Sequence, residues 1–499
     1  MTSIRVADIE NGRINVNYPS KLNCYAVVCW GFAACAGLMF GYDIGISGGV
    51  TAMNDFLIKF FPDVYRRKLR AREDNYCKYD DQKLQLFTSS LYLAALASSF
   101  LASSICKRYG RKRTMLGASL FFLAGAGLSS GAQNICMLII GRISLGVGVG
   151  FGNEAAPLFL SETATVKLRG AINILFQLFV TMGILMANSV NYGTSGMHKN
   201  GWRLSLGLAA VPAFLLFVGS IFIDETPTSL VEQDKEAEGK RVLRNIRGVE
   251  DVDAEFEQIK AANERAKQVK GSLKNLMKRS SLPPVIIGTV LQVFQQFTGI
   301  NAIMFYAPVL FQTVGFKNNG SLVSALVTGF VNVLSTLIAV FLADKAGRRF
   351  LLRLSSVIMF VSQVIIGIIL VTSLKATGSL PEAQAYTVLI FVCLFVFAFA
   401  WSWGPLGWLI PSETFPVETR TAGFAFAVSS NMLFTFIIAQ AFLSMMCHMR
   451  AGIFFFFSAW ILVMGLCAQW LLPETKGVPI DLMVERVWKQ HWFWKRFMD

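Results

Sequence analysis

The sequence predicts an all-α membrane protein in which twelve spanning helices form two halves of six helices each. Three observations support this prediction: the composition is strongly apolar, twelve apolar runs are long enough to cross a bilayer, and polar loop motifs of the first half recur in the second. Hydrophobic residues make up 54% of the 499 residues and charged residues only 15%, whereas roughly 25% charged residues is usual in soluble domains. The chain is therefore expected to lie in the lipid bilayer as one body.

Each predicted span is a mostly apolar run, because about 20 such residues in a helix cross the hydrocarbon core. The first run is too long for a cleaved signal peptide and lacks a small-residue cleavage site, so it is expected to remain as a helix. The runs of the first half are 22–46, 84–105, 114–136, 139–160, 170–191 and 202–223. Those of the second half are 284–313, 321–343, 349–373, 386–411, 421–445 and 449–472.

Polar segments then divide the chain into five parts. The first half and the second half are joined by a charged linker with amphipathic helical stretches, and a polar tail lies at each end. A long loop follows the first helix. The predicted boundaries are 1–21 for the N-terminal tail, 22–223 for the first half with its loop at 47–83, 224–283 for the linker, 284–472 for the second half and 473–499 for the C-terminal tail.

The formal charge of +15 would suggest a nucleic-acid partner in a soluble protein. Here the Lys and Arg residues gather in the short loops on one side of the predicted bundle and in the two tails. Such loops lie in the cytoplasm as a rule. We therefore expect both termini in the cytoplasm, the loop 47–83 outside, and no nucleic-acid partner.

Short polar motifs recur in equivalent loops of the two halves, at nearly equal sequence offsets. Two six-helix halves related by a parallel repeat are the architecture of the major facilitator fold. The positive charge of these loops follows from topology alone, but the two equivalent Glu residues after helices 4 and 10 do not. We expect the paired acids and bases to close the inner face of the protein. They are Arg111, Glu162, Arg169 and Glu225 in the first half, and Arg348, Arg349, Glu413, Arg420 and Glu474 in the second.

Amide side chains occur at membrane depth on several predicted helices. Gln292, Gln295 and Gln296 have the spacing of one helix face. Asn301 would lie on another side of a regular helix, but a break at Gly299 would turn it toward the same face, and discontinuous helices line transporter sites. A single amide more often holds helices together, yet further amides on three other helices favour a central polar cavity. These are Gln177, Asn332 and Asn431.

Two ionisable residues lie inside predicted spans at matching depth. Asp43 is near the outer end of the first span and Arg142 near the outer end of the fourth. Ionisable residues within spans are energetically costly and usually functional. An Asp that pairs with Arg when ionised and releases it when protonated is a two-state switch. The alternatives are a helix-end cap for Asp43 and snorkelling to the interface for Arg142.

The chain resembles the plant sugar transport proteins, which are monosaccharide/proton symporters of the plasma membrane within the sugar porter family of the major facilitator superfamily. The resemblance runs from about residue 20 to the end of the sequence. The segments that carry it are Phe40–Val50, Leu86–Leu93, Gly141–Arg142, Gln295–Asn301, Trp401–Trp408 and Pro473–Gly477.

This resemblance implies a protein that imports a glucose-like hexose with protons by alternating access, works as a monomer in the lipid bilayer, and uses Asp43 with Arg142 for proton coupling. Amides suit a sugar because each hydroxyl donates and accepts hydrogen bonds, as an amide does. The sugar contacts that the resemblance implies are Gln177, Gln295, Gln296, Asn301, Asn332 and Trp408, with Phe40, Ile44, Gly404 and Thr435 as weaker candidates.

The nine cysteines include no CxxC pair, and there are only three His residues, so neither a metal site nor a cofactor is expected. Topology places Cys77, Cys136 and Cys447 on the outer, oxidising side. The resemblance implies a disulfide between Cys77 and Cys447. The chain departs from the family pattern at Glu154, where relatives usually carry Gln, and this residue is either a second titrating group or an impediment to transport.

Three other functions fit the sequence less well than proton-coupled import. A facilitative uniporter generally lacks an acid at the position of Asp43. A non-transporting sugar sensor is expected to carry long cytoplasmic signalling tails, which this sequence does not show. A membrane enzyme fits least, because the sequence contains no nucleophile–base set and no metal cluster.

Overall fold

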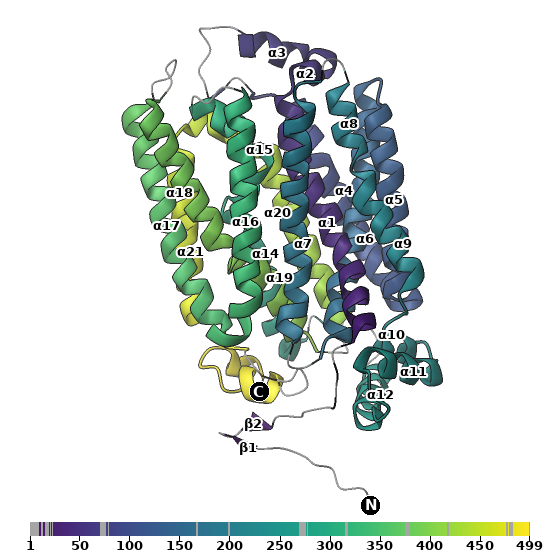
Figure 1. Cartoon of the computed structure of the whole chain (residues 1–499). Helices are drawn as coiled ribbons and strands as arrows, with labels where there is room; N and C mark the ends of the chain where they lie inside the picture. Colours follow the sequence, from purple (N-terminus) through teal and green to yellow (C-terminus); the bar gives the residue numbers. More distant parts are fainter. Residues whose placement is uncertain are drawn as a thin grey trace, which may run out of the picture.

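The protein is a bundle of long helices that run side by side, with both chain ends at one end of the bundle (Figure 1). We call that end the terminal face and the opposite end, crossed by the short helices α2 (Asn54–Phe60) and α3 (Pro62–Leu69), the lid face. The computed structural model describes residues 9–10, 13–14, 19, 21, 23–69, 76–77, 79–165, 168–197, 200–268, 276, 278–314, 318–374, 380–416, 419–475, 478 and 483–498.

The first half contains five long helices and one span made of two pieces. They are α1 (Cys24–Ala52), α4 (Gln82–Tyr109), α5 (Arg111–Gly131), α6 (Ile135–Thr163) and α7 (Arg169–Thr194), followed by α8 (Gly201–Gly207) with α9 (Ala210–Phe222).

The second half contains two spans that are each broken near the middle of the bundle. Its helices are α14 (Leu282–Phe297), α15 (Ile300–Val314), α16 (Asn318–Ala346), α17 (Arg348–Ser373), α18 (Glu382–Ala400), α19 (Trp403–Thr414), α20 (Arg420–Met449) and α21 (Gly452–Trp470). Eleven helical stretches of the described chain are long and apolar enough to cross a membrane. The pair α14 and α15, each too short alone, makes the twelfth span.

The predicted break at Gly299 is present. Gly299 has φ of +83°, a left-handed conformation that glycine adopts without steric cost. The freed backbone groups are partly satisfied locally, because the Thr298 hydroxyl donates to the Gln295 carbonyl at 2.7 Å and accepts from the Ile300 N–H at 3.2 Å. The span therefore bends at Gly299 while the Thr298 hydroxyl satisfies two of these groups.

The prediction that the long loop 47–83 starts at residue 47 is wrong, because α1 remains helical through Ala52. Small residues let this end of α1 pack tightly between neighbours. A Cβ atom on Gly48 would lie 2.2 Å from the Phe305 carbonyl oxygen, and one on Gly49 would lie 2.0 Å from Asn191 Nδ2. Close packing thus keeps α1 helical beyond residue 46, where its apolar run ends.

At the terminal face, the helices that follow the first half pack against the ends of α1 and α6. Helices α10 (Pro227–Glu232), α11 (Glu236–Arg247) and α12 (Asp253–Gln268) follow the first half, and strands β1 (Ile9–Glu10) and β2 (Arg13–Ile14) precede it. Arg247 of α11 donates to the carbonyls of Thr163 at 2.7 Å and Ala164 at 3.2 Å. The linker helices therefore cap the end of α6.

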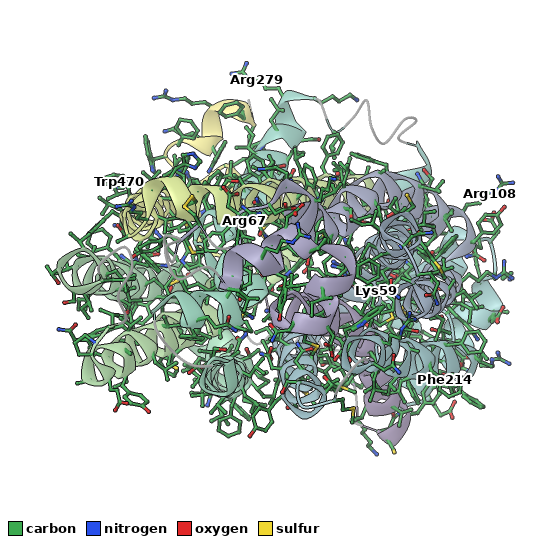
Figure 2. All side chains as sticks on the ribbon, turned by 90° about the horizontal axis from the view of Figure 1, so that it is seen from above. Lys59, Arg67, Arg108, Phe214, Arg279 and Trp470 are labelled. Carbon is green, nitrogen blue, oxygen red and sulfur yellow. A yellow bond between two sulfur atoms is a disulfide. The ribbon has the colours of Figure 1, made fainter. Side chains whose placement is uncertain are left out.

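The two halves meet along α1 with α15, α7 with α16 and α19, and α4 with α20. Hydroxyl contacts line the last of these seams, such as the 2.7 Å bond between Ser99 and Ser429. The outer surface is apolar by contrast: Phe214, Ile390 and Phe341 are more than half exposed. Figure 2 shows Phe214 at the edge of the bundle, whereas Lys59 and Arg67 of the lid lie over it. The exposed flanks fit a lipid environment.

Candidate functional site

A cavity of about 440 Å³ lies between the two halves, near the middle of the bundle. Helices of both halves line it, including both pieces of the broken span α14–α15. Eight of the ten predicted sugar contacts are among the lining residues. These eight are Phe40, Ile44, Gln177, Gln295, Gln296, Asn301, Asn332 and Trp408.

The amides on α14 are fixed by bonds to other helices. Gln295 Nε2 donates to the carbonyls of Trp403 and Gly404, each at 3.0 Å, and Gln295 Oε1 accepts from Asn431 Nδ2 at 2.7 Å. The same Asn431 amide donates to Gln292 Oε1 at 2.6 Å. These bonds tie α14 to α19 and α20 and hold the polar wall of the cavity in place.

Other polar groups at the cavity keep unused hydrogen-bonding capacity. The Asn301 amide donates to Gln296 Oε1 at 2.5 Å. Asn332 Oδ1 is buried and has no hydrogen-bond partner among the described residues. Trp408, only 3% exposed, packs edge-on against Phe176 with ring centroids 5.6 Å apart. The cavity thus offers amide donors and acceptors on its walls and an aromatic side chain, which is the combination that a sugar requires.

Two predicted contacts, Gly404 and Thr435, do not line the cavity. Gly404 supplies a carbonyl to Gln295, and the Thr435 hydroxyl donates to the Asn431 carbonyl at 2.7 Å. Both lie one layer behind the lining. Asn431 does line the cavity, and its amide character at membrane depth was the signal that marked it. The apolar lining residue Phe399 carried no such signal in the sequence.

Asp43 and Arg142 form a buried ion pair, as their matching depth predicted. Their side chains are 1% and 0% exposed. Arg142 also donates to the Ser47 hydroxyl at 2.9 Å and to the Phe87 carbonyl at 3.0 Å, and its guanidinium lies 4.9 Å from the centre of the Phe87 ring. The sequence did not single out Ser47 or Phe87, because a hydroxyl and a backbone carbonyl leave no distinctive pattern.

The ion pair is incompletely satisfied on the acid side. Asp43 Oδ2 is buried and has no hydrogen-bond partner among the described residues. An unpaired carboxylate oxygen in a closed environment is energetically costly. Phe40 and Ile44 line the cavity. Asp43 directly precedes Ile44 and lies about one helical turn after Phe40. One helix, α1, therefore carries the acid and part of the cavity wall.

The charged residues at the terminal face form two nearly identical networks, one in each half. In the first, Arg111 pairs with Glu162 at 2.7 Å, and the Thr226 hydroxyl donates to Glu162 at 2.7 Å. In the second, Arg348 pairs with Glu413 at 3.1 Å, and the Thr475 hydroxyl donates to Glu413 at 3.2 Å. The sequence repeat is thus a structural repeat.

Glu225 and Glu474 join these networks as helix caps. Glu225 accepts from the N–H groups of Arg111 at 2.9 Å and Lys112 at 3.0 Å, and Glu474 does the same for Arg348 and Arg349 at 3.1 and 3.2 Å. Carboxylates stabilise helix N-termini in this way. Burial raises the pKa of the Glu225 carboxyl, while Arg111 and the N–H groups act in the opposite direction.

The ion pairs of Arg111 with Glu162 and of Arg348 with Glu413 each join residues of the same half. Two other interactions cross between the halves at this end. Asn173 of α7 donates to the Ser412 hydroxyl of α19 at 2.5 Å, and Arg169 of α7 interacts electrostatically with Glu413. Arg420, its counterpart in the second half, lies at the start of α20.

We predict that Gly110→Ala destabilises the first network. Gly110 has φ of +95°, and a Cβ atom there would lie 2.2 Å from Glu225 Oε2. The strained backbone and the displaced carboxylate together should cost about 1–3 kcal/mol, seen as a lower melting temperature of the purified protein. Gly127→Ala is the matched control, since no atom lies within 4 Å of its added Cβ. Equal melting temperatures for the two variants would contradict the prediction.

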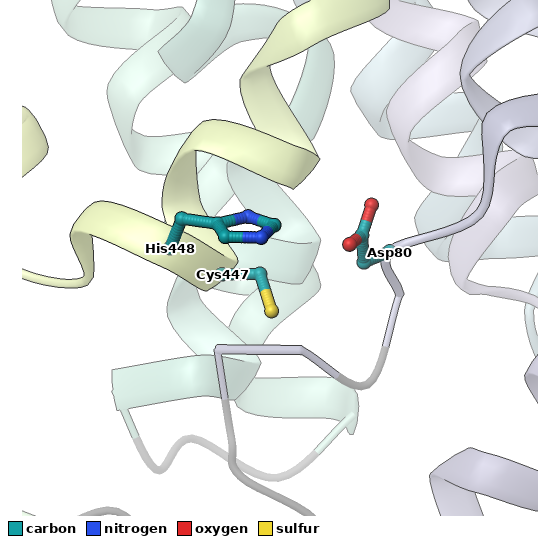
Figure 3. A group of neighbouring side chains, drawn as sticks. All are labelled: Asp80, Cys447 and His448. Carbon is teal, nitrogen blue, oxygen red and sulfur yellow. The ribbon is translucent and has the colours of Figure 1, made fainter.

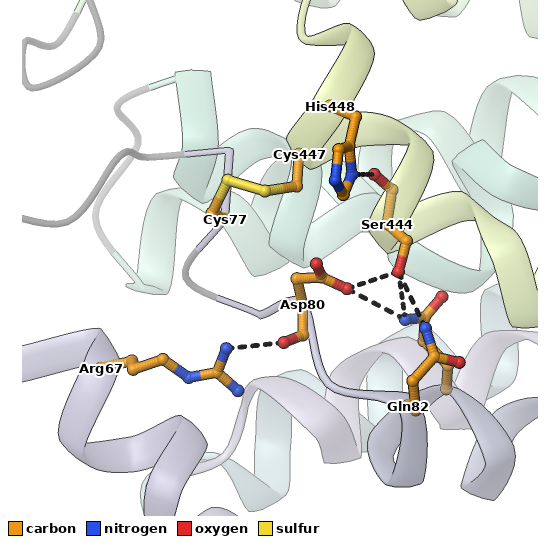
Figure 4. Close-up of a disulfide and its surroundings, with 8 residues drawn as sticks. Arg67, Cys77, Asp80, Gln82, Ser444, Cys447 and His448 are labelled. Carbon is orange, nitrogen blue, oxygen red and sulfur yellow. Dashed lines mark hydrogen bonds between the residues drawn. A yellow bond between two sulfur atoms is a disulfide. The ribbon is translucent and has the colours of Figure 1, made fainter.

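At the lid face, a disulfide joins Cys77 to Cys447 and so links the two halves (Figure 4). Beside it, Ser444 donates to Asp80 Oδ1 at 2.5 Å, and Arg67 of α3 donates to the Asp80 carbonyl at 2.6 Å. Asp80, Cys447 and His448 also lie close together (Figure 3). This trio is a poor metal site, because the Cys447 sulfur is bonded to Cys77 and provides no thiolate.

Comparison with known proteins places these features in context. The family model described as "Sugar (and other) transporter" matches residues 29–488. The chain is 64% identical to "Sugar transport protein 8" of Arabidopsis thaliana, covering 97% of this chain and 95% of the relative. It is 57% identical to "Sugar transport protein MST4" of Oryza sativa subsp. japonica, covering 97% and 94%.

Solved structures show the same fold. The major facilitator superfamily proton:xylose symporter XylE bound to 6-bromo-6-deoxy-D-glucose superposes with a TM-score of 0.79 at 24% identity, covering 92% of this chain and 99% of that one. The inward open conformation of the xylose transporter XylE from E. coli superposes with a TM-score of 0.70, also at 24% identity, covering 92% and 98%. The predicted major facilitator fold is therefore confirmed.

Proposed function

Because this chain belongs to the sugar porter family of the major facilitator superfamily, we propose that it imports a monosaccharide, a glucose-like hexose, together with protons across the plasma membrane. The observation that carries the proton coupling is the buried pair of Asp43 and Arg142, whose acid lies on the same helix as the cavity-lining residues Phe40 and Ile44. The sugar assignment rests on the amide-lined cavity and on the names of the relatives.

Proton binding at Asp43 would change the local energetics of α1. The ionised carboxylate attracts Arg142, whereas protonation removes that attraction and leaves the guanidinium with Ser47 and the Phe87 carbonyl. Phe40 and Ile44 belong to α1 and move with it, so a shift of this helix alters the cavity wall that a sugar contacts. Sugar and proton would thereby favour the same arrangement, which is the requirement for coupled transport.

The sugar would be held by Gln177, Gln295, Gln296, Asn301 and Asn332, with Trp408 against its apolar face. Asn431 would assist by fixing Gln295. The unpartnered Asn332 Oδ1 supports this assignment, because a buried acceptor without a donor gains a hydrogen bond when a sugar hydroxyl arrives.

Alternating access would separate the halves at the terminal face, which we assign to the cytoplasm with both chain ends. The networks around Arg111 and Arg348 lie within single halves and would keep each half rigid. Opening would break the bond between Asn173 and Ser412 and the attraction between Arg169 and Glu413. We propose that one chain suffices, since the cavity is built by the two halves of a single chain.

Uptake of labelled sugars into cells that lack their own hexose transporters tests this function. We expect accumulation of a hexose that collapses when a protonophore is added. A facilitative uniporter would instead equilibrate the sugar with no effect of the protonophore, and a sensor would give no uptake above that of cells without the protein. Either result would overturn proton-coupled import.

We predict that Cys77→Ala alters the pH dependence of uptake while the protein stays folded in the membrane. Loss of the disulfide to Cys447 should loosen the lid, so that water and salt reach the region of Asp43 and screen its attraction to Arg142. Uptake against pH, normalised to surface protein, measures the effect. Cys136→Ala is the control, because Cys136 is an exposed free thiol. Less protein with an unchanged pH profile would mean that the disulfide serves stability alone.

A further inference from the structure

A second cavity, of about 420 Å³, lies at the terminal end of the second half, away from the sugar site. Helices α14 and α21 form its sides, and Trp494 of the C-terminal segment lines it at the terminal end. The side chains that line it along α14 are Ile286, Ile287, Val290, Leu291 and Phe294. From Ile286 to Phe294 this wall extends over about 12 Å, at 1.5 Å per helical residue.

Apart from the Cys467 thiol, the described lining of this crevice has no polar side chain without a hydrogen-bond partner. The Trp403 indole N–H donates to the Ser356 hydroxyl at 3.0 Å, and the Trp494 indole N–H donates to the Leu471 carbonyl at 2.7 Å. A sugar would find no partner here. Ile286 is 37% exposed and the neighbouring Trp470 is 55% exposed, so the crevice lies at the outer, lipid-facing surface. Its chemistry suits a hydrocarbon chain.

The C-terminal segment closes the terminal end of this crevice. It contains η3 (Val484–Trp488) and η4 (Trp494–Phe497). The Trp492 indole N–H donates to the Trp470 carbonyl at 3.0 Å, so two indoles, Trp492 and Trp494, satisfy the last carbonyls of α21. Arg279, just before α14, donates to the Arg496 carbonyl at 2.6 Å. The segment is therefore held across the ends of α14 and α21.

Basic residues adjoin the crevice, because Lys495 and Arg496 directly follow the lining residue Trp494 and Arg279 donates to the Arg496 carbonyl. Arg279, Lys495 and Arg496 are exposed, and Figure 2 shows Arg279 and Trp470 toward the same side of the bundle. The segment 483–499 carries Arg486, Lys489, Lys495 and Arg496 against two acids, Glu485 and Asp499. An apolar slot with a basic rim at the membrane surface matches an anionic lipid, whose headgroup is attracted to such clusters.

We propose that this crevice binds an anionic phospholipid, with one acyl chain along α14 and α21 and the phosphate-bearing headgroup at Arg279, Lys495 and Arg496. The acyl chain of a zwitterionic lipid would also fit the crevice, but its headgroup carries no net charge and would be attracted less strongly to the basic rim. The bound lipid would connect the C-terminal segment to α14, the helix that carries Gln295 at its other end. The site thus lies at a junction between the surface and the transport core.

Lipid cross-linking to the unmodified protein tests the position of this site. The protein is placed in nanodiscs of phosphatidylcholine with a minor fraction of phosphatidylserine that bears a photoreactive acyl chain, and the labelled residues are mapped. We expect label concentrated within 286–294 and 467–472. The same probe on phosphatidylcholine should label these residues several-fold less. Labels spread evenly over the lipid-facing helices, or equal labelling by the two lipids, would overturn the proposal.

Variants then test the basic rim and the apolar crevice separately. Arg279→Gln with Arg496→Gln should reduce the preference for phosphatidylserine several-fold, and Val290→Trp should reduce labelling by filling the crevice. Arg108→Gln is the control, since Arg108 is an exposed basic residue at the terminal end of α4 in the first half. Retention of the lipid preference in the double variant, or an equal loss in the control, would show nonspecific attraction and refute the site.

Discussion

Replacement of Asp43 by Asn is expected to abolish proton-driven accumulation of sugar while equilibration of the sugar across the membrane survives in part. Asn has nearly the same shape but cannot ionise, so the attraction that holds Arg142 is lost at every pH. One proton moving through 100 mV provides about 2.3 kcal/mol, or roughly 50-fold accumulation. The inside-to-outside ratio of sugar should therefore fall from such values to about 1.

The measurement is the steady-state accumulation of a non-metabolised hexose in energised vesicles. Asp63→Asn is the matched control, because the Asp63 side chain on α3 is 82% exposed and forms an ion pair with Arg66, which is also exposed. Full, pH-dependent accumulation by Asp43→Asn would remove Asp43 from proton coupling. A loss of the same size in Asp63→Asn would point to a general effect of removing an acid.

Replacement of Gln295 by Ala is expected to weaken sugar binding by about 1–3 kcal/mol, or roughly 5- to 150-fold in apparent affinity. The side chain faces the cavity and also bonds the carbonyls of Trp403 and Gly404 and the amide of Asn431. Loss of the Gln295 side chain should therefore remove a sugar contact and leave the Asn431 amide less firmly held. Asn301→Ala should weaken binding within the same range, because only its bond to Gln296 is lost within the protein.

Competition binding of unlabelled hexose to purified protein measures both variants, and the melting temperature without sugar reports damage to the fold. Gln133→Ala is the control, since Gln133 is an exposed amide outside the cavity. Unchanged affinity in both Gln295→Ala and Asn301→Ala would remove α14 and α15 from the sugar site. An equal loss of affinity in the control would show that the assay reports something other than the cavity.

The broken span at Gly299 could be predicted from the sequence because a glycine there precedes a polar Asn within an apolar run. The break between α18 and α19, at Trp401 and Ser402, was not predicted. Neither of these two residues has the conformational freedom of glycine or lacks an N–H as proline does. The local cause is Pro405, which has no N–H to donate to the Trp401 carbonyl four residues before it and whose ring would clash with that carbonyl in a continuous helix. The nearby carbonyls of Trp403 and Gly404 accept from Gln295, a partner that is distant in sequence.

Glu154 illustrates a residue that the sequence marked and could not explain. It is fully buried in α6, and both carboxyl oxygens lack a hydrogen-bond partner among the described residues. Arg111 is the charged group that acts on it, rather than Arg142. The spacing along one helix showed that Arg142 was out of reach, but the approach of Arg111 from α5 arises only from packing.

Sugar-driven proton movement in liposomes that contain only the purified protein tests the coupling most directly. With equal pH on both sides and no membrane potential, hexose is added outside, and a dye reports the internal pH. Proton-coupled import predicts that the interior becomes acidic, that a protonophore abolishes the change, and that Asp43→Asn shows none. Entry of labelled hexose without any change in internal pH would contradict proton coupling and leave a uniporter.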